Sequence, residues 1–246
     1  MMSTKLKICG ITRMEDAVQL AELGVDFLGF NFYPESPRYI SPAAARDLIL
    51  AVRHRCQTVG ILVRPTRKTV QEVLEKSGVT LLQIYEPIDF QDYSDIPVPV
   101  IDCARISDPA IIPDPRRGAA YLLLDRFHPR QMGGTGQAFD WQRLPDHLPR
   151  SRLILAGGIH PGNIRQALEQ VAPAVIDVAS GAEHSPGVKD ISRVLQLLEA
   201  LAHFNARQYR RMHSALPGNP SKAGNFPVAG KATQSKKSIL KSGRNP

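Results

Sequence analysis

The sequence predicts an α/β fold of the (β/α)8 or TIM-barrel class, followed by a disordered basic C-terminal tail. Eight short apolar segments alternate with amphipathic stretches between residues 5 and 204, a pattern typical of repeated βα units. The 246 residues are enough for one such barrel, which needs roughly 200–250. Eight parallel strands with crossovers favour a closed barrel, although periodicity alone leaves a doubly wound open sheet as the alternative.

The predicted strands are apolar runs bounded by turn residues. In chain order they are Leu6–Ile11, Phe27–Phe32, Thr58–Val63, Leu81–Ile84, Val98–Cys103, Ala120–Asp125, Leu153–Ala156 and Val175–Val178. Active sites of these barrels lie at the carboxyl ends of the strands, so the residues there are the first candidates. They are Cys9-Gly10, Asn31, Arg64, Tyr85, Arg105, Asp125, Gly157-Gly158 and Ser180-Gly181.

The predicted helices repeat apolar residues with a period near 3.6. They are Glu15–Leu23, Pro42–Arg53, Thr69–Ser77, Pro161–Val171 and Asp190–Phe204. Ser41 is a suitable N-cap for the second helix, whose first residue would be Pro42. The connections after the fourth, fifth and sixth strands show weaker helix signals, because prolines interrupt them.

The positive charge is concentrated at the C-terminus. Residues 205–246 hold nine Lys or Arg and no Asp or Glu, so the net charge of +8 becomes −1 for residues 1–204. We therefore divide the chain into a barrel catalytic domain (1–204) and a flexible basic tail (205–246), since the tail has too few apolar residues to order itself. Weak binding of polyanions is the alternative role for this tail.

The composition excludes several classes of protein. No apolar run is long enough to cross a membrane, and the N-terminus leads into a strand pattern without a signal peptide. Cys9, Cys56 and Cys103 are too few for a disulfide framework or a zinc site. We expect a cytoplasmic location.

Glycine-rich segments follow the last three predicted strands. They contain Gly133, Gly134 and Gly136, then Gly157 and Gly158, then Ser180 and Gly181. Glycine lets backbone N–H groups approach an anion closely, and barrel enzymes often bind phosphate at the loops after strands seven and eight. The segment 181–189 could supply the short extra helix of such a site. The sequence therefore predicts a phosphate site, although each glycine pair alone would suit an ordinary turn.

Two strand ends offer an acid and a base. Alternation along the first strand predicts that Lys7 and Cys9 point into the barrel, opposite to Leu6 and Ile8. A thiol acts as a base only if its pKa is lowered, to which Lys7 could contribute, and the alternative is a small buried apolar residue. Asp125 is either a functional acid, with a pKa raised by burial, or a cap for the next turn.

Two further charged residues are candidates for binding substrate. Arg38, held in a strand-end loop after Pro37, could clamp a carboxylate with two hydrogen bonds, or it could be an exposed loop residue. Asp177 alternates with Ile176 and Val178 and so could face the barrel interior. There it would bind a sugar hydroxyl or pair with Lys7.

Several segments together resemble the phosphoribosylanthranilate isomerases of tryptophan biosynthesis, in order over residues 5–200. They are Lys7–Arg13 with Glu15-Asp16-Ala17, Leu28–Tyr33, Ser36–Tyr39, Leu123–Asp125, Gly133–Gly136, Phe139–Trp141, Leu155–Ile159 with Asn163, Asp177–Glu183, Pro186-Gly187 and Lys189-Asp190. The resemblance implies the Amadori rearrangement of N-(5-phosphoribosyl)anthranilate to 1-(2-carboxyphenylamino)-1-deoxyribulose 5-phosphate, an aldose–ketose isomerisation. It implies Asp125 as the general acid, Cys9 as the general base, Arg38 on the anthranilate carboxylate and the glycine loops on the phosphate. It implies neither a metal nor an organic cofactor.

The chain departs from the family pattern at two strand ends. Tyr85-Glu86-Pro87 stands where the family usually has His-Gly after Gln-Leu, and Arg64 stands where a smaller polar residue is usual. We expect both changes to alter the pocket and the substrate range rather than the reaction type. Ala179, which replaces a common serine near the phosphate site, is a milder change, and the basic tail has no counterpart in the family pattern.

Two alternative functions are weaker. A histidine-pathway isomerase on a related phosphate-binding barrel is expected to use two carboxylates, which the thiol of Cys9 argues against. A nucleic-acid-binding or scaffolding protein would be supported by the tail alone, and the near-neutral body is the wrong electrostatic surface for that role.

Overall fold

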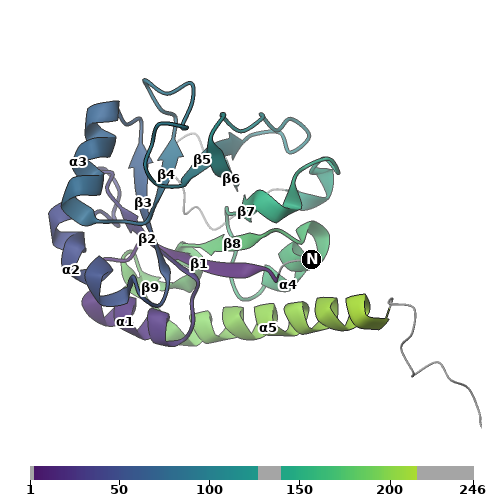
Figure 1. Ribbon diagram of the computed structural model, residues 1–246. Helices are drawn as coiled ribbons and strands as arrows, with labels where there is room; N and C mark the ends of the chain where they lie inside the picture. Colours follow the sequence, from purple (N-terminus) through teal and green to yellow (C-terminus); the bar gives the residue numbers. More distant parts are fainter. Residues whose placement is uncertain (1–2, 127–139, 215–246) are drawn as a thin grey trace, which may run out of the picture.

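The predicted barrel is present in the computed structural model, which describes residues 3–126 and 140–214. Eight parallel strands follow one another around a closed ring, and β8 pairs with β1 to complete it (Figure 1). They are β1 (Lys5–Cys9), β2 (Phe27–Asn31), β3 (Gln57–Val63), β4 (Leu81–Tyr85), β5 (Val100–Ile106), β6 (Ala119–Arg126), β7 (Leu153–Leu155) and β8 (Val175–Val178). Every predicted strand is confirmed, so the open sheet is excluded.

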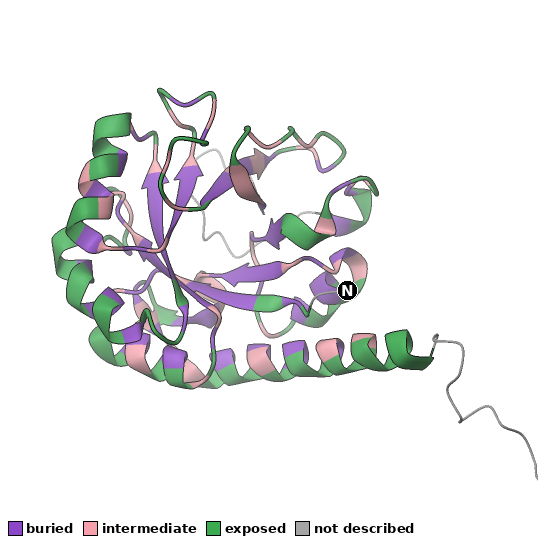
Figure 2. Cartoon of the chain, viewed as in Figure 1, coloured by how far each residue is buried: buried purple, intermediate pink, exposed green. Residues whose placement is uncertain are grey.

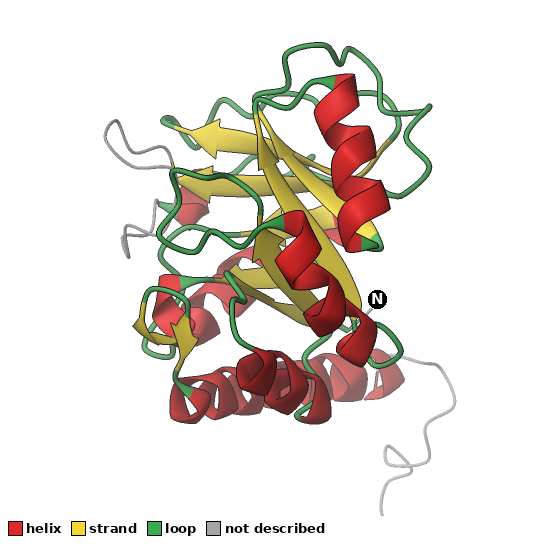
Figure 3. Ribbon diagram, turned by 90° about the vertical axis from the view of Figure 1, so that its left-hand side faces the viewer, coloured by secondary structure: helices red, strands yellow, loops and turns green. Residues whose placement is uncertain are grey.

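The helices lie outside the strands. The α-helices are α1 (Met14–Glu22), α2 (Pro42–Val52), α3 (Arg67–Ser77), α4 (Ile164–Val171) and α5 (Ile191–Ser214). Short 3-10 turns are η1 (Trp141–Arg143), η2 (Arg150–Arg152) and η3 (Ser180–Ala182), and a small antiparallel hairpin consists of β9 (Glu183–Ser185) and β10 (Val188–Lys189). Figure 3 shows the helices outside the strands, and α5 runs past β1 and β8 in Figure 1. Within the described residues, no helix is both long and apolar enough to cross a bilayer.

Local signals explain where most helices begin. Ser41 accepts a hydrogen bond from the amide of Ala44 and caps α2, as predicted. Thr66 caps α3 in the same way, so this helix begins at Arg67 rather than at the predicted residue 69. Helix α4 begins three residues later than predicted. The chain first makes a turn in which Asn163 accepts a hydrogen bond from the amide of His160.

The connections that join β4, β5, β6 and β7 contain no α-helix in their described residues. They consist there of loops and the turns η1 and η2, as the weak helix signals predicted. Strand β5 begins at residue 100 rather than at the predicted residue 98. Pro97 and Pro99 account for the difference, because they lack the amide proton that a strand ladder uses. The carboxyl mouth of the barrel is therefore bordered on one side by loops.

Alternate strand residues serve two separate cores. Leu6, Ile8 and Leu28 belong to the large cluster that packs between the strands and the helices. Phe27, Val59 and their counterparts on the other strands form a second cluster inside the barrel. Figure 2 shows the result: the strands are buried almost throughout, whereas the helices expose their outer faces. The side chain of Lys7 thus points inward, as predicted.

An ion pair lies among the apolar side chains of the barrel interior. The Nζ of Lys7 is 2.8 Å from Oδ2 of Asp177, and Lys7 has no exposed surface. Because β1 and β8 place these residues opposite each other, the closure of the barrel brings the two charges together. A buried charge needs such a partner, and the loss of one member would leave the other uncompensated.

Helix α5 is longer than predicted. The expected end at Phe204 is wrong, because residues 205–214 continue the helix with strong helix formers. Asn205 ties it to the start of β1: its Oδ1 accepts from the amide of Thr4 and its Nδ2 donates to the carbonyl of Thr4, both at 2.9 Å. The division of the chain at residue 204 stays a prediction, and residues 215–246 lie outside the described part.

We expect Asn205→Ala to lower the free energy of unfolding by about 1–2 kcal/mol, because it removes two hydrogen bonds between the first strand and the last helix. Urea unfolding of the full chain, followed by circular dichroism, measures this. His203→Ala, on the exposed face of the same helix, is the matched control. Equal stability of the two variants would show that this contact contributes nothing.

Candidate active site

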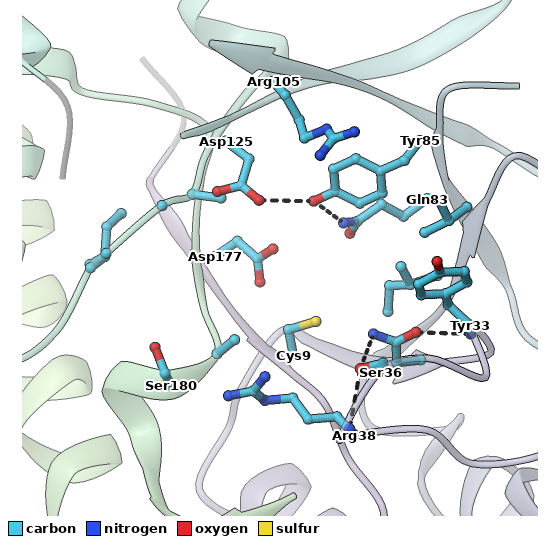
Figure 4. A pocket seen from close by; sticks show the side chains of 18 residues that line it. Cys9, Tyr33, Ser36, Arg38, Gln83, Tyr85, Arg105, Asp125, Asp177 and Ser180 are labelled. Carbon is cyan, nitrogen blue, oxygen red and sulfur yellow. Dashed lines mark hydrogen bonds between the residues drawn. The ribbon is translucent and has the colours of Figure 1, made fainter. Parts of the chain in front are cut away.

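A cavity opens at the carboxyl ends of the strands, and all eight strands or the loops that follow them contribute to its wall. Its polar side chains converge on one space (Figure 4). They belong to Cys9, Asn31, Tyr33, Ser36, Arg38, Gln83, Tyr85, Arg105, Asp125, Asp177 and Ser180.

The thiol of Cys9 lies in this cavity, at the end of β1. Its sulfur points into the open space rather than toward the helices (Figure 4). Burial raises the pKa of this thiol above its usual value, and the nearby ammonium of Lys7 opposes that effect without overcoming it. Lys7 thus lowers the pKa as expected, but its contribution is too small to make the net shift downward. Desolvation is the largest effect, and the negative charge of Asp177, the ion-pair partner of Lys7, raises the pKa further.

Asp125 enters the same cavity from the end of β6, across from Cys9 in Figure 4. Its residue is only 6% exposed, and burial together with the nearby Asp177 raises its pKa to about 6. The hydroxyl of Tyr85 donates to its Oδ2 at 3.3 Å. A carboxyl group with this pKa holds a proton over a useful part of the neutral range and can donate it.

Asp177 faces both the interior and the cavity. One carboxylate oxygen, Oδ2, binds Lys7, whereas Oδ1 is buried and accepts a hydrogen bond from no described residue. An unpaired buried acceptor at the wall of a cavity is suited to a ligand hydroxyl or a water molecule. The two roles considered for this residue are thus compatible, because each uses a different oxygen.

Arg38 lines the cavity but is not an exposed loop residue. Its Nε donates to both carboxylate oxygens of Glu183 at 2.9 and 3.0 Å, and its Nη2 donates to Oε2 at 2.6 Å. Glu183 also binds the ammonium of Lys189 at 2.7 Å, and Lys189 donates to the carbonyl of Cys9 at 2.6 Å. Glu183 thus binds the edge of the guanidinium that carries Nε and Nη2, and the edge that carries Nη1 remains for a ligand.

The loop that carries Arg38 is shaped by short polar contacts. Asn31, at the end of β2, donates from Nδ2 to Oγ of Ser36 at 3.0 Å, and the same oxygen accepts from the amide of Arg38 at 3.1 Å. Gly10 allows the arginine to lie against β1, because a Cβ there would be 2.4 Å from the Cδ of Arg38. Gly10 also has a φ of +81°, which side chains rarely adopt.

The glycines after β7 lie where the phosphate site was predicted. Gly157 and Gly158 line the cavity with φ values of +83° and +70°, and Asn163 fixes the loop by donating to the carbonyl of Gly158. Ser180 lines the cavity as well, at the start of η3. Gly181 does not line it. A Cβ at Gly181 would be 2.0 Å from the carbonyl oxygen of Ile159, so this glycine permits close packing of the two loops.

The other predicted positions have different outcomes. Gly133, Gly134 and Gly136 lie outside the described residues. The predicted position of Arg64 in the pocket wall is wrong: it is exposed at the end of β3 with a φ of 49°, and Val63 lines the cavity instead. At the end of β4, Tyr85 lines the cavity as expected, and Glu86 forms an ion pair with Arg105.

Two contributors were missed by sequence reasoning. Glu183 and Lys189, on the small hairpin, were recognised as parts of a motif but were given no role, although both are buried. The only available signal was chemical: an inward-facing Arg38 requires an acidic partner. No set of three His, Cys, Asp or Glu side chains within the described ranges forms a group that could hold a metal ion.

Comparison with known proteins gives one consistent result. Residues 6–200 match the family model described as N-(5'phosphoribosyl)anthranilate isomerase. Proteins of that name from Nitrosospira multiformis and from Geobacter sp. strain M21 are 37% and 40% identical to this chain, covering 81% and 78% of it and 97% and 94% of their own lengths.

Solved structures agree with the sequence matches. The phosphoribosyl anthranilate isomerase of Thermus thermophilus superimposes with a TM-score of 0.69 at 34% identity, over 81% of this chain and 99% of that one. Another isomerase of this name, in complex with reduced 1-(o-carboxyphenylamino)-1-deoxyribulose 5-phosphate, has a TM-score of 0.64 at 28% identity and covers 81% and 99%.

The pKa of Asp125 predicts a pH-dependent cost to stability. A pKa raised to about 6 in the folded chain stabilises it only while the carboxyl is protonated, and this contribution disappears as the pH rises through that value. We expect Asp125→Asn to gain about 2–3 kcal/mol of unfolding free energy over the native chain between pH 4 and pH 7. Urea unfolding at several pH values measures this gain. The exposed Asp47→Asn controls for the substitution itself, and parallel curves for Asp125→Asn and the native chain would contradict the assignment.

Proposed function

The chain belongs to the N-(5'-phosphoribosyl)anthranilate isomerase family, and we propose that it uses Cys9 and Asp125 as base and acid in that reaction. The reaction is an Amadori rearrangement in tryptophan biosynthesis. It converts N-(5'-phosphoribosyl)anthranilate, an aminoaldose, into 1-(2-carboxyphenylamino)-1-deoxyribulose 5-phosphate, an aminoketose. One observation carries the assignment: a thiol and a carboxyl group from β1 and β6 face a single cavity.

The first step is ring opening with Asp125 as the general acid. Its proton passes to the ring oxygen of the ribose while the bond from that oxygen to C1′ breaks. The lone pair of the anthranilate nitrogen forms the C=N bond of an iminium ion. Burial supports this role, because a carboxyl with a pKa of about 6 still holds a proton where an exposed one would not.

The second step is removal of the C2′ proton by the thiolate of Cys9. The electrons of the C–H bond form a C1′–C2′ double bond and neutralise the iminium nitrogen, which gives an enolamine. The enolamine then tautomerises to the ketone by moving the proton of the C2′ hydroxyl to C1′. The positive charge of the iminium makes the C2′ proton acidic, so a thiolate is a sufficient base.

The basic form of Cys9 is scarce in the free enzyme. Burial raises the pKa of the thiol, so the active arrangement, with Asp125 protonated and Cys9 ionised, is a minority state. Lys7 and Lys189 oppose the rise and help to keep the thiolate accessible. The raised pKa of Cys9 makes its thiolate a stronger base than an ordinary one, and this reactivity compensates for the low population of the active state.

The remaining wall of the cavity is suited to the two ends of a sugar phosphate with an aromatic carboxylate. We place the phosphate at the backbone of Gly157, Gly158 and Ser180, where side chains do not obstruct the amides. Arg38 would bind the carboxylate through the edge that Glu183 leaves open. The free oxygen of Asp177 would accept from a sugar hydroxyl. Gly133, Gly134, Gly136 and Gly181 remain proposed contributors to the phosphate end.

The location and the tail are also proposals. Cys9, Cys56 and Cys103 are free thiols, which suits a reducing cytoplasm. The proposed mechanism draws its acid and base from the barrel alone, so the basic tail would have no part in the chemistry.

Replacement of either proposed catalytic group is expected to reduce kcat by at least about a hundredfold, the usual scale for a positioned acid or base. The measurement is a coupled assay with phosphoribosylanthranilate generated in situ, comparing Cys9→Ala and Asp125→Asn with the native chain. Cys56→Ala is the matched control, because this thiol is buried against the helices and does not line the cavity. A rate near that of the native chain in either variant would remove that residue from the mechanism.

The dependence of kcat/KM on pH is expected to be bell-shaped. The active form carries one proton fewer than the fully protonated site, so its population rises up to the pKa of Asp125, about 6. The population of the active form then stays constant until the pH reaches the raised pKa of Cys9, and it falls at higher pH. A steady loss of activity from pH 5 upward would contradict the requirement for an ionised base.

A further inference from the structure

A directed chain of hydrogen bonds stands behind Asp125 on β4. Gln83 donates from Nε2 to the hydroxyl oxygen of Tyr85 at 3.1 Å, and that hydroxyl donates to Oδ2 of Asp125 at 3.3 Å (Figure 4). Gln83 and Tyr85 are two residues apart on one strand, so both side chains point to the same side of β4. Both line the cavity with Asp125.

The direction of this chain follows from the number of protons. A phenol has one proton to donate, and the oxygen of Tyr85 already accepts from Gln83. Its own proton therefore goes to the carboxylate oxygen. Gln83 is only 1% exposed, so it is held in place and keeps the phenol oriented. Burial raises the pKa of Tyr85 well above its ordinary value, which keeps the donor proton in place throughout the neutral range.

We propose that Tyr85 is a positioning residue for the general acid: it holds Oδ2 of Asp125 and stabilises the carboxylate that remains after the proton has left. The proposal rests on the proposed role of Asp125. Without this hydrogen bond, the carboxylate would form in a buried site beside the negatively charged Asp177. Tyr85 therefore makes Asp125 a stronger acid than its burial alone would allow.

Other groups around Asp125 act on the same equilibrium. They are Lys7 on β1, Cys103 on β5, Asp177 on β8 and the amide of Arg126, and Cys9 and Arg105 line the same cavity. Asp177 opposes ionisation, whereas Lys7 and the Arg126 amide favour it. Tyr85→Phe removes one hydroxyl and leaves all of these groups in place, so it isolates the contribution of the phenol.

The direct test is a titration of the free enzyme. Full-length protein with aspartate labelled at the carboxyl carbon is titrated by 13C NMR, and the resonance of Asp125 is assigned by its loss in Asp125→Asn. We expect Tyr85→Phe to raise the pKa of Asp125 by about half a unit to one unit, the size of one hydrogen bond lost from the charged form. An unchanged or lowered value would overturn the proposal, since a fall would mean that Tyr85 accepts from the protonated acid.

The matched control is Tyr33→Phe, another tyrosine of the cavity wall whose hydroxyl makes no hydrogen bond to Asp125. We expect the resonance of Asp125 to titrate in this variant as it does in the native chain. An equal rise in both variants would overturn the proposal, because the shift would then reflect a general disturbance of the pocket.

The kinetic test separates this proposal from the proposed function. The acid limb of kcat/KM should move upward in Tyr85→Phe by the same amount as the NMR pKa, and it should not move in Tyr33→Phe. The phosphate of the substrate also titrates near pH 6, but it is the same for all variants and cancels in the comparison. If Tyr85→Phe raises the pKa of Asp125 measured by NMR but leaves the acid limb of kcat/KM unchanged, Asp125 is not the general acid, and both proposals are overturned. If neither moves, only the role of Tyr85 is overturned.

Discussion

The closure of the barrel by β1 and β8 is the constraint on which the site depends. The register of these two strands places Lys7 beside Asp177, and their ion pair fills the interior where an unpaired charge would be costly. With Lys7 fixed inward, the alternation of the strand makes Cys9 point inward one step closer to the mouth. The same pairing holds Asp177 with one oxygen toward Lys7 and the other free at the cavity wall. Structural and chemical roles are therefore divided between atoms of one side chain.

A second group of charges links the hairpin after β8 to β1, the strand that carries the proposed base. Glu183 binds Arg38 and Lys189, and Lys189 reaches the carbonyl of Cys9. The two cations lower the pKa of Glu183 in spite of its burial, so the carboxylate remains charged. A movement of the hairpin would thus be transmitted both to the arginine that faces the cavity and to the backbone of the thiol.

Desolvation determines the chemistry of the cavity. It raises the pKa of both Cys9 and Asp125, so that the proposed acid holds its proton near neutrality and the thiolate of the proposed base is rare but reactive. The hydrogen bond from Tyr85 offsets part of the rise in the pKa of Asp125, and the charge of Lys7 offsets part of the rise in the pKa of Cys9. The balance between burial and a few directed contacts is typical of sites in which two titratable groups must hold opposite protonation states.

The sequence by itself determined where the strands lie along the chain and that Lys7 and Cys9 point inward, because these features follow from local patterns of period 2 and 3.6. It also placed Asp125, Gly157 and Gly158 at strand ends, so the main features of the site were predictable. The family resemblance, not spacing, assigned the reaction to those residues.

Only the tertiary structure decided which partners those residues have. Glu183 is 145 positions from Arg38, and Tyr85 is 40 positions from Asp125, so neither contact has a local signal in the chain. The net pKa of Cys9 could not be predicted either, because it depends on how burial balances against Lys7. Arg64 was misplaced for the same reason: a left-handed backbone at the end of β3 turns it away, and such a turn depends on neighbouring strands rather than on residue type. Local patterns fix which face a side chain takes, whereas pairing and desolvation arise only when distant segments meet.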